Sequence, residues 1–213
     1  HRRTNQRHSV PRLFAMELDS SRPLHQQVRP GVSQRGDFSL QVARACLLVI
    51  DIQKYLSHHP KHPYFTQKFV STIENIQRLA GAFRRIRDDQ ETCLGCEVLF
   101  TYLQSATKNG RDISLDYKLS GPELAGIPHV GDSDIFLDQC RPDVDSGKGD
   151  ILLPKTSCSV FQSTNLDYLL RNLQIEQLVV VGQLTDQCVE SAVRDAADLG
   201  YLVTVVDDSC VAY

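Results

Sequence analysis

The chain has 213 residues, of which 41% are hydrophobic, and this suits one α/β domain with a packed core. Its net charge of -3 gives no general attraction to nucleic acid or to an anionic membrane. No apolar run approaches the roughly 20 residues of a membrane-spanning helix, so we expect neither a membrane nor a nucleic-acid partner.

The seven Cys are scattered and odd in number, which indicates a reduced, cytoplasmic protein rather than a disulfide scaffold. Cys46, Cys158 and Cys210 lie in apolar runs typical of strands. An organellar or secreted location stays open, because the sequence begins at His1 without an initiator Met and a cleaved segment would explain this.

Residues 1–42 are rich in Arg, Ser and Gln and show no sustained periodicity, so we expect an N-terminal extension. A flexible tail, a targeting remnant and an arm that clasps a neighbouring subunit are the alternatives, and we favour an arm lying on a surface. Residues 43–213 are predicted to form a single domain.

The first element of that domain is the continuous apolar run 45–50, which predicts a strand buried on both faces of a parallel sheet. Helical spacing of apolar residues follows over 66–87, and 97–103 is the second predicted strand. The polar stretch 104–130 is too long for a plain connection, so we expect it to cover a substrate.

The third predicted strand is 151–154, and Ser163 or Thr164 is expected to cap a helix that ends at Leu173. Residues 177–181 form the fourth predicted strand and 202–206 the fifth, with a helix over 185–199 that Gly200 terminates. We expect one more covering helix beyond Tyr213. The alternation predicts an α/β fold: a single-domain, three-layer α/β/α arrangement with a mostly parallel, Rossmann-like sheet.

Three reactive side chains follow three separate strands: Asp51, Lys155 and Cys188. The carboxyl ends of parallel strands share one edge of the sheet, so these side chains can converge. Cys188 falls in the first turn of the helix over 185–199, where the partial positive charge of a helix N-terminus stabilises a thiolate. Asp51 can accept the thiol proton and Lys155 can hold the thiolate, which suits attack on a carbonyl carbon.

Three segments in this order resemble the isochorismatase-like cysteine hydrolases, which include nicotinamidases and ureido- and carbamoyl-cleaving amidohydrolases. The segments are Leu47-Leu48-Val49-Ile50-Asp51-Ile52-Gln53, Leu153-Pro154-Lys155 and Gly182-Gln183-Leu184-Thr185-Asp186-Gln187-Cys188-Val189, running on to Arg194-Asp195-Ala196. The resemblance covers 43–213 and is specific for the superfamily rather than for a substrate.

The resemblance implies that Asp51, Lys155 and Cys188 are a catalytic triad that cleaves a small amide, ureido or carbamoyl compound through a Cys thioester. It also implies a non-proline cis peptide between Gln183 and Leu184, with the backbone N–H groups of Leu184 and Cys188 forming an oxyanion hole. The same resemblance implies a homo-oligomer, dimer or tetramer. We expect no cofactor.

The sequence departs from the metal-binding nicotinamidases after the second strand, where Thr101-Tyr102-Leu103-Gln104-Ser105-Ala106-Thr107 contains no His. His58, His59 and His62 cluster elsewhere in the sequence, without an accompanying Asp. His-rich loops of this kind are more often simply polar than metal-binding. We therefore predict no metal, and nicotinamidase activity is disfavoured.

Four further residues are candidates for binding the substrate. Gln53 follows the Asp51 strand end, and Arg111 and Lys118 offer cationic groups for a carboxylate, although a solvated charged loop would look the same. Phe161 would form an apolar pocket wall or belong to the core.

Two other functions remain open from the residues. An isochorismatase would use Asp51 as an acid on a vinyl ether and release pyruvate, without needing Cys188. A non-enzymatic interaction protein could keep the fold, but such a protein has no reason to keep all three reactive side chains.

Overall fold

The computed structural model describes residues 40–57, 63–89, 95–119 and 127–212. The predicted N-terminal arm lies almost wholly outside these residues, as do His58, His59 and His62. Within the described part of the chain, no helix has the length and apolar character needed to cross a membrane.

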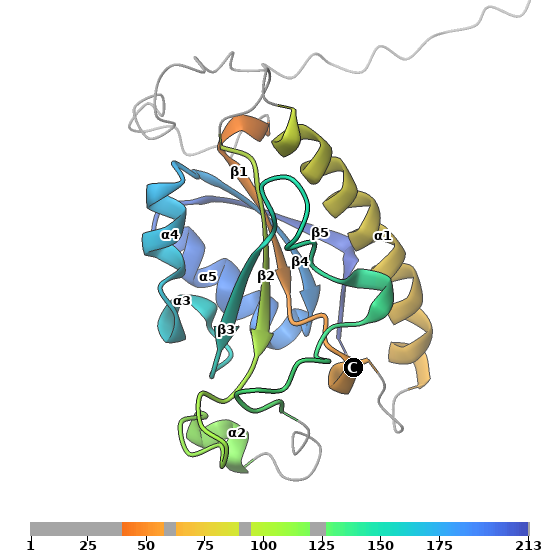
Figure 1. Ribbon diagram of the computed structural model, residues 1–213, viewed down its shortest axis with the longest axis vertical. Coiled ribbons are helices and arrows are strands. Elements are labelled where there is room, and N and C mark those ends of the chain that lie inside the picture. Colours follow the sequence, from red (N-terminus) through yellow and green to blue (C-terminus); the bar gives the residue numbers. More distant parts are fainter. Residues whose placement is uncertain (1–39, 58–62, 90–94, 120–126, 213) are drawn as a thin grey trace, which may run out of the picture. The chain divides into compact units, whose positions relative to one another are not determined.

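A five-stranded parallel sheet forms the centre of the domain (Figure 1). Its strands are β1 (Ala45–Ile50), β2 (Glu97–Leu103), β3 (Ile151–Lys155), β4 (Gln177–Gln183) and β5 (Leu202–Val211), in the order β3-β2-β1-β4-β5. Every side chain of β1 is fully buried, because this strand pairs with β2 on one edge and β4 on the other while helices cover both faces. The parallel sheet expected from the apolar runs is confirmed.

Helices cover the two faces of the sheet and complete the three layers (Figure 1). The long helix α1 (Pro63–Asp88) packs on one face, with Phe69, Ile76 and Phe83 in the apolar cluster there. The other face is covered by α3 (Val160–Ser163), α4 (Leu166–Asn172) and α5 (Glu190–Asp198). The three-layer α/β/α prediction is therefore confirmed.

Several boundaries differ from the prediction. The helix expected after Ser163 or Thr164 is α4, and Thr164 Oγ1 accepts a hydrogen bond from the Leu166 N–H at 3.1 Å. A further helix, α3, precedes it, and the Ser159 side chain caps α3 by accepting a hydrogen bond from the Gln162 N–H. Cys158 lies in the loop between β3 and α3 rather than in a strand. The polar stretch after β2 contains a short helix, α2 (Leu115–Leu119), which its composition concealed.

The helix carrying Cys188 begins as a π-helical turn, Thr185–Val189, before α5 continues it. Gly200 adopts a φ of 91° after α5, which is the C-terminal role predicted for it.

Gly182 allows β4 to lie directly against the end of β1. Its φ is 124°, a conformation that only glycine adopts readily. A Cβ at this position would lie 2.2 Å from the Ile50 carbonyl oxygen and 2.7 Å from the Ile50 nitrogen. A glycine is thus required at position 182, because the backbones of β4 and β1 lie so close together there. The position immediately precedes Gln183 and the turn that carries Cys188.

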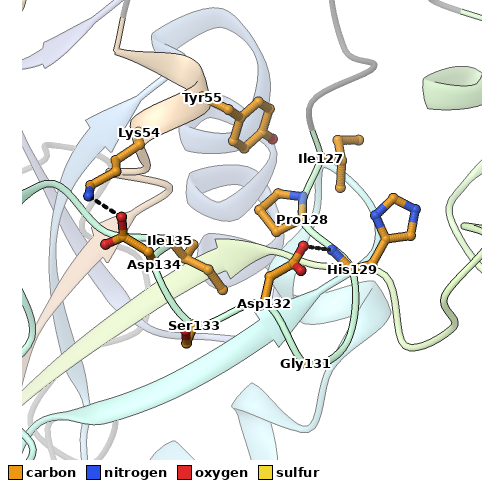
Figure 2. A pocket seen from close by; sticks show the side chains of 10 residues that line it. All are labelled: Lys54, Tyr55, Ile127, Pro128, His129, Gly131, Asp132, Ser133, Asp134 and Ile135. Carbon is orange, nitrogen blue, oxygen red and sulfur yellow. Dashed lines mark hydrogen bonds and ion pairs between the residues drawn. The ribbon is translucent and has the colours of Figure 1, made fainter.

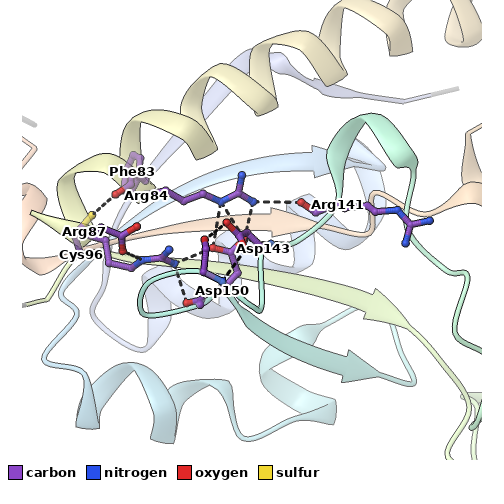
Figure 3. Close-up of polar contacts among 10 residues, drawn as sticks. Phe83, Arg84, Arg87, Cys96, Arg141, Asp143 and Asp150 are labelled. Carbon is purple, nitrogen blue, oxygen red and sulfur yellow. Dashed lines mark hydrogen bonds and ion pairs between the residues drawn. The ribbon is translucent and has the colours of Figure 1, made fainter.

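A buried ion-pair network joins α1 to the start of β3 (Figure 3). The Asp150 carboxylate accepts hydrogen bonds from Arg87 Nη1 at 2.8 Å and Arg84 Nη2 at 2.6 Å, and also from the Asp143 N–H at 2.8 Å. The side chains of Arg87 and Asp150 have no exposed surface. This network holds the amino end of β3 in place, and Lys155 stands at the other end of that strand.

Candidate active site

Asp51 lies directly beyond the carboxyl end of β1, in the middle of the sheet. Its side chain is fully buried, and its Oδ1 accepts a hydrogen bond from Thr101 Oγ1 at 2.9 Å. The Asp51 carbonyl accepts a hydrogen bond from the Gln183 side-chain amide at 2.8 Å. Asp51 has a φ of 55°, a left-handed conformation that Asp tolerates better than most residues. Neighbouring strands therefore fix this carboxylate from both sides.

Lys155, the last residue of β3, extends to Asp51 although β2 lies between the two strands. Its Nζ is 2.8 Å from Asp51 Oδ2 and 3.3 Å from Cys188 Sγ. It also donates to the carbonyl oxygens of Ser157 and Cys158, at 2.9 and 3.3 Å. Burial alone would lower the pKa of this ammonium, but its interactions with the Asp51 carboxylate and the Cys188 sulfur outweigh burial and raise it. The group is therefore a permanent buried cation.

Cys188 lies in the π-helical turn that follows β4, and its side chain is buried. The peptide bond between Gln183 and Leu184, just before that turn, is cis. The structure thus brings Asp51, Lys155 and Cys188 together in one chain of contacts, from carboxylate to ammonium to sulfur. A carboxylate, an ammonium and a thiol in this order can activate a sulfur nucleophile and move its proton.

The proton affinity of Cys188 differs from the expectation of a helix-stabilised thiolate. Its pKa is raised well above the ordinary value, first by a hydrogen bond with the Cys158 thiol, then by burial and by the charge of Asp51. Lys155 and Tyr117 act in the opposite direction. The sulfur of Cys188 therefore holds its proton, and the Asp51 carboxylate lies on the other side of the Lys155 ammonium.

Tyr117 and Cys158 complete the surroundings of the Cys188 sulfur, and neither was among the residues predicted for the site. The Tyr117 hydroxyl lies 3.2 Å from Cys158 Sγ and 3.5 Å from Cys188 Sγ. The pKa of Cys158 falls to about 6, chiefly because of its hydrogen bond with Cys188 and despite partial burial. Burial and the nearby thiol charges raise the pKa of Tyr117, which keeps its hydroxyl a hydrogen-bond donor.

The loop between β2 and α2 delivers Tyr117 to this position. Asp112 organises the loop: its carboxylate accepts hydrogen bonds from Ser105 Oγ at 2.7 Å and from the N–H groups of Ala106 and Thr107 at 2.6 and 3.1 Å. The Thr107 hydroxyl also donates to this carboxylate and has the largest effect. Together these hydrogen bonds hold the pKa of Asp112 below its usual range. Residues 120–126 of the predicted covering stretch lie outside the described residues.

The four predicted substrate-binding residues have other contacts in the structure. Gln53 is fully buried, and its amide both donates to and accepts from the Leu103 backbone, at 3.0 and 2.7 Å. Lys118 and Arg111 are exposed, and the Lys118 ammonium donates to the Arg111 carbonyl at 2.6 Å. Phe161 packs in the apolar layer with its ring 6.0 Å from that of Tyr201. Gln53 thus joins the segment after β1 to the end of β2, and Phe161 packs partly buried in the apolar layer. A role of these four residues in substrate binding stays a prediction.

A cavity of about 650 Å³ is formed by residues other than the three reactive ones (Figure 2). It is lined by Lys54 and Tyr55 from the segment after β1 and by residues of the stretch Ile127–Ile135. Lys54 pairs with Asp134 at 2.6 Å across its wall. None of Asp51, Lys155 and Cys188 lines this cavity. Its volume therefore does not indicate the size of a substrate that these residues would act on.

Among the described residues, no group of three or more His, Cys, Asp or Glu side chains is arranged to hold a metal ion. The three clustered histidines, His58, His59 and His62, fall outside those residues, so the expectation of a metal-free site stays a prediction.

Comparison with known proteins places this arrangement in context. The model of the Isochorismatase domain matches residues 45–213. A stretch of 74 residues is 49% identical to ureidoacrylate amidohydrolase RutB of Agrobacterium fabrum, covering 35% of this chain and 31% of that protein. A stretch of 49 residues is 49% identical to nicotinamidase of Escherichia coli, 23% of each protein.

The matches thus span less than a third of the length of either curated relative. Among solved structures, a cysteine hydrolase from Pseudomonas syringae pv. phaseolicola superposes with a TM-score of 0.64 at 24% identity, over 81% of this chain and 75% of that one. At this identity the likeness shows the fold.

Proposed function

The chain belongs to the isochorismatase family, and from that premise we propose that it is an amidohydrolase acting on a small amide, ureido or carbamoyl substrate. The observation that carries this proposal is the buried line of contacts from Asp51 through Lys155 to Cys188, at 2.8 and 3.3 Å. The similarity to a ureidoacrylate amidohydrolase supports the C–N bond as the target.

In the proposed reaction, Asp51 accepts the thiol proton and the Cys188 sulfur attacks the carbonyl carbon of the substrate. Lys155 stabilises the thiolate through its ammonium group. The C–N bond breaks as the leaving nitrogen takes the proton from Asp51, which gives ammonia or an amine and a Cys188 thioester. Water, deprotonated by Asp51, then hydrolyses the thioester and restores the thiol.

The backbone N–H groups of Leu184 and Cys188 are proposed to stabilise the oxyanion that forms on the carbonyl oxygen. Leu184 directly precedes the π-helical turn that contains Cys188, so both N–H groups belong to the connection after β4. We further propose that the reaction needs no metal, because the carbonyl would be polarised by these N–H groups.

The test is a paired assay of the parent chain and Cys188→Ala. One panel contains small amides and ureides, followed by ammonia release, and the other is isochorismate, followed by pyruvate release. Ammonia release is expected to fall on the order of 10⁴-fold or more in Cys188→Ala, as for other enzymes that lose a nucleophile.

Cys140→Ala is the matched control, because Cys140 is a buried thiol of the opposite apolar layer and should leave ammonia release unchanged. Ammonia release that survives Cys188→Ala would contradict the thioester mechanism. Pyruvate release that survives it would favour instead a vinyl-ether hydrolase centred on Asp51.

A further inference from the structure

The proposed reaction uses one thiol, but the site contains two. Cys158 lies in the loop that joins β3 to α3, and its Sγ shares the Tyr117 hydroxyl with Cys188, at 3.2 and 3.5 Å. Each thiol also shifts the pKa of the other: Cys188 lowers that of Cys158, and Cys158 raises that of Cys188. A second cysteine so close to the nucleophile has no task in amide hydrolysis, and it offers chemistry of its own.

The surroundings of the two sulfurs differ in a way that assigns them different roles. Cys158 is partly exposed, whereas Cys188 is only 4% exposed. Lys155 Nζ lies 3.3 Å from the Cys158 carbonyl oxygen and 3.3 Å from Cys188 Sγ, and its charge helps to lower the pKa of the Cys158 thiol. Reactive thiols are typically partly exposed and have a lowered pKa, as Cys158 has.

The other thiols with resolved shifts have the opposite environment. Burial raises the pKa of Cys140 to about 12 and that of Cys210 to about 11, so both remain protonated and unreactive at neutral pH. Cys46, in β1, is fully buried and its pKa is raised for the same reason. Among these thiols of the described residues, oxidation should therefore be selective for the pair in the site.

We propose that Cys158 and Cys188 form an oxidation site for small hydroperoxides, at which Cys158 reacts first and Cys188 then closes a reversible disulfide. The Cys158 thiolate attacks the O–O bond of the hydroperoxide, forming a sulfenic acid and releasing an alcohol or, from hydrogen peroxide, water. The Cys188 sulfur displaces the hydroxyl group from the Cys158 sulfur, which forms the S–S bond and releases water. The two thiols lose two electrons and two protons in all, and the hydroperoxide is reduced.

The disulfide would remove the sulfur that the proposed amide hydrolysis requires. Loss and recovery of activity with oxidation and reduction rest on the proposed function, whereas formation of the disulfide does not. The same bond would also protect Cys188, because a disulfide can be reduced by other thiols while a sulfinic acid cannot.

The first experiment uses the full chain and hydrogen peroxide. After brief exposure the remaining thiols are alkylated, and the peptides are mapped by mass spectrometry without reduction. We expect one cross-linked peptide pair containing Cys158 and Cys188, which dithiothreitol releases. Separate alkylation of both cysteines, or their oxidation to sulfinic acids without a cross-link, would overturn the proposal.

Single substitutions then assign the order of the two steps. In Cys188→Ser, Cys158 should accumulate as a sulfenic acid that a cyclic 1,3-dione traps, because the second thiol is missing. In Cys158→Ser, oxidation of Cys188 should slow by about tenfold or more, since a buried protonated thiol reacts poorly. Oxidation of Cys188 at the parent rate in Cys158→Ser would show that Cys158 does not react first and would overturn the assignment.

Cys140→Ser is the matched control, in which the cross-link should form as in the parent chain. Ammonia release from an accepted substrate, followed in parallel, separates the two proposals. A cross-link in a chain that hydrolyses no amide supports the oxidation site and contradicts the proposed function. Amide hydrolysis without a cross-link does the reverse.

Discussion

Lys155 is an ammonium group without solvent contact, held between a carboxylate and a thiol. A buried ammonium is stable only while its partners remain, because burial removes its hydration and an unpaired charge gains no interaction that compensates for this loss. The same ammonium is central to the proposed chemistry, so a substitution there changes folding and activity together. The two effects can be separated by removing its partner as well.

Lys155→Met should lower the free energy of unfolding by about 3–5 kcal/mol, because it leaves the fully buried Asp51 carboxylate without its cation. The double variant Asp51→Leu with Lys155→Met should recover most of that stability, since a buried pair replaced by apolar groups is often neutral. Urea unfolding measures both. Activity should be lost in both variants, and a double variant as unstable as Lys155→Met would contradict the ion-pair interpretation.

The reactivity of Cys158 should depend on pH in a defined direction. Its pKa is lowered to about 6, so the reactive thiolate predominates above that pH and disappears below it. Its alkylation by iodoacetamide, followed by peptide mapping, should therefore rise as the pH increases through about 6. Tyr117→Phe removes a hydrogen bond that lowers this pKa and should move the rise to higher pH. A rise only above pH 8 in the parent chain would contradict the prediction.

At the scale of the elements, the junction of β4 with β1 is the most exacting piece of backbone around the site. Gly182→Ala should destabilise the chain by more than about 4 kcal/mol, because the new Cβ would overlap the Ile50 backbone. Gly81→Ala is the control, as Gly81 lies within α1 and a Cβ there would meet only Arg85 Nη1, at an ordinary 3.6 Å. It should stabilise the chain by about 0.5–1 kcal/mol. Equal urea midpoints for the two variants would contradict this reading.

The network around Asp150 should be a second point of high sensitivity, although it lies at the end of β3 opposite Lys155. Asp150→Ala leaves the buried Arg87 with only the partly exposed Asp88 carboxylate as a partner, and should cost up to about 3–5 kcal/mol in urea unfolding. Glu190→Gln breaks a comparable pair with Arg194 that is largely exposed, and should cost only about 0.3–0.5 kcal/mol. Similar costs for the two substitutions would show that burial does not decide the strength of these pairs.

The strands and the three residues at their ends were predictable because both depend on patterns local in sequence. The apolar runs 45–50 and 97–103 match β1 and β2 residue for residue. Asp51 directly follows β1, Lys155 is the last residue of β3, and Cys188 lies in the turn after β4. Tyr117 and Cys158 were missed for the opposite reason. Tyr117 comes from a five-residue helix in a polar stretch, and its place beside Cys188 depends on the loop that Asp112 organises.

The π-helical turn at Cys188 could not be predicted from the sequence either, because its apolar spacing resembles that of an ordinary α-helix. The pKa of Cys188 is raised by the thiol of Cys158 and by burial. Neither effect can be recognised from the position of Cys188 at the start of a helix. The sequence therefore predicts which side chains meet at the edge of the sheet better than it predicts the pKa values of those side chains.

For the molecule as a whole, association of several chains stays a prediction from the family resemblance. Light scattering coupled to gel filtration should give a mass that is two or four times that of one chain. A mass equal to that of a single chain would contradict the predicted homo-oligomer. The measurement should be made with the full 213-residue chain, because the predicted arm is a candidate for the contact.

The central position of β1 has a consequence during synthesis. This strand leaves the ribosome first among the five, yet one of its edges stays unpaired until β4 follows, since Asp51 and Gln183 are separated by 132 positions. In the meantime the nascent polypeptide carries a wholly apolar strand with an open edge, which is prone to self-association. Interrupted translation should therefore yield aggregates, which chaperones must restrain, rather than partly active fragments.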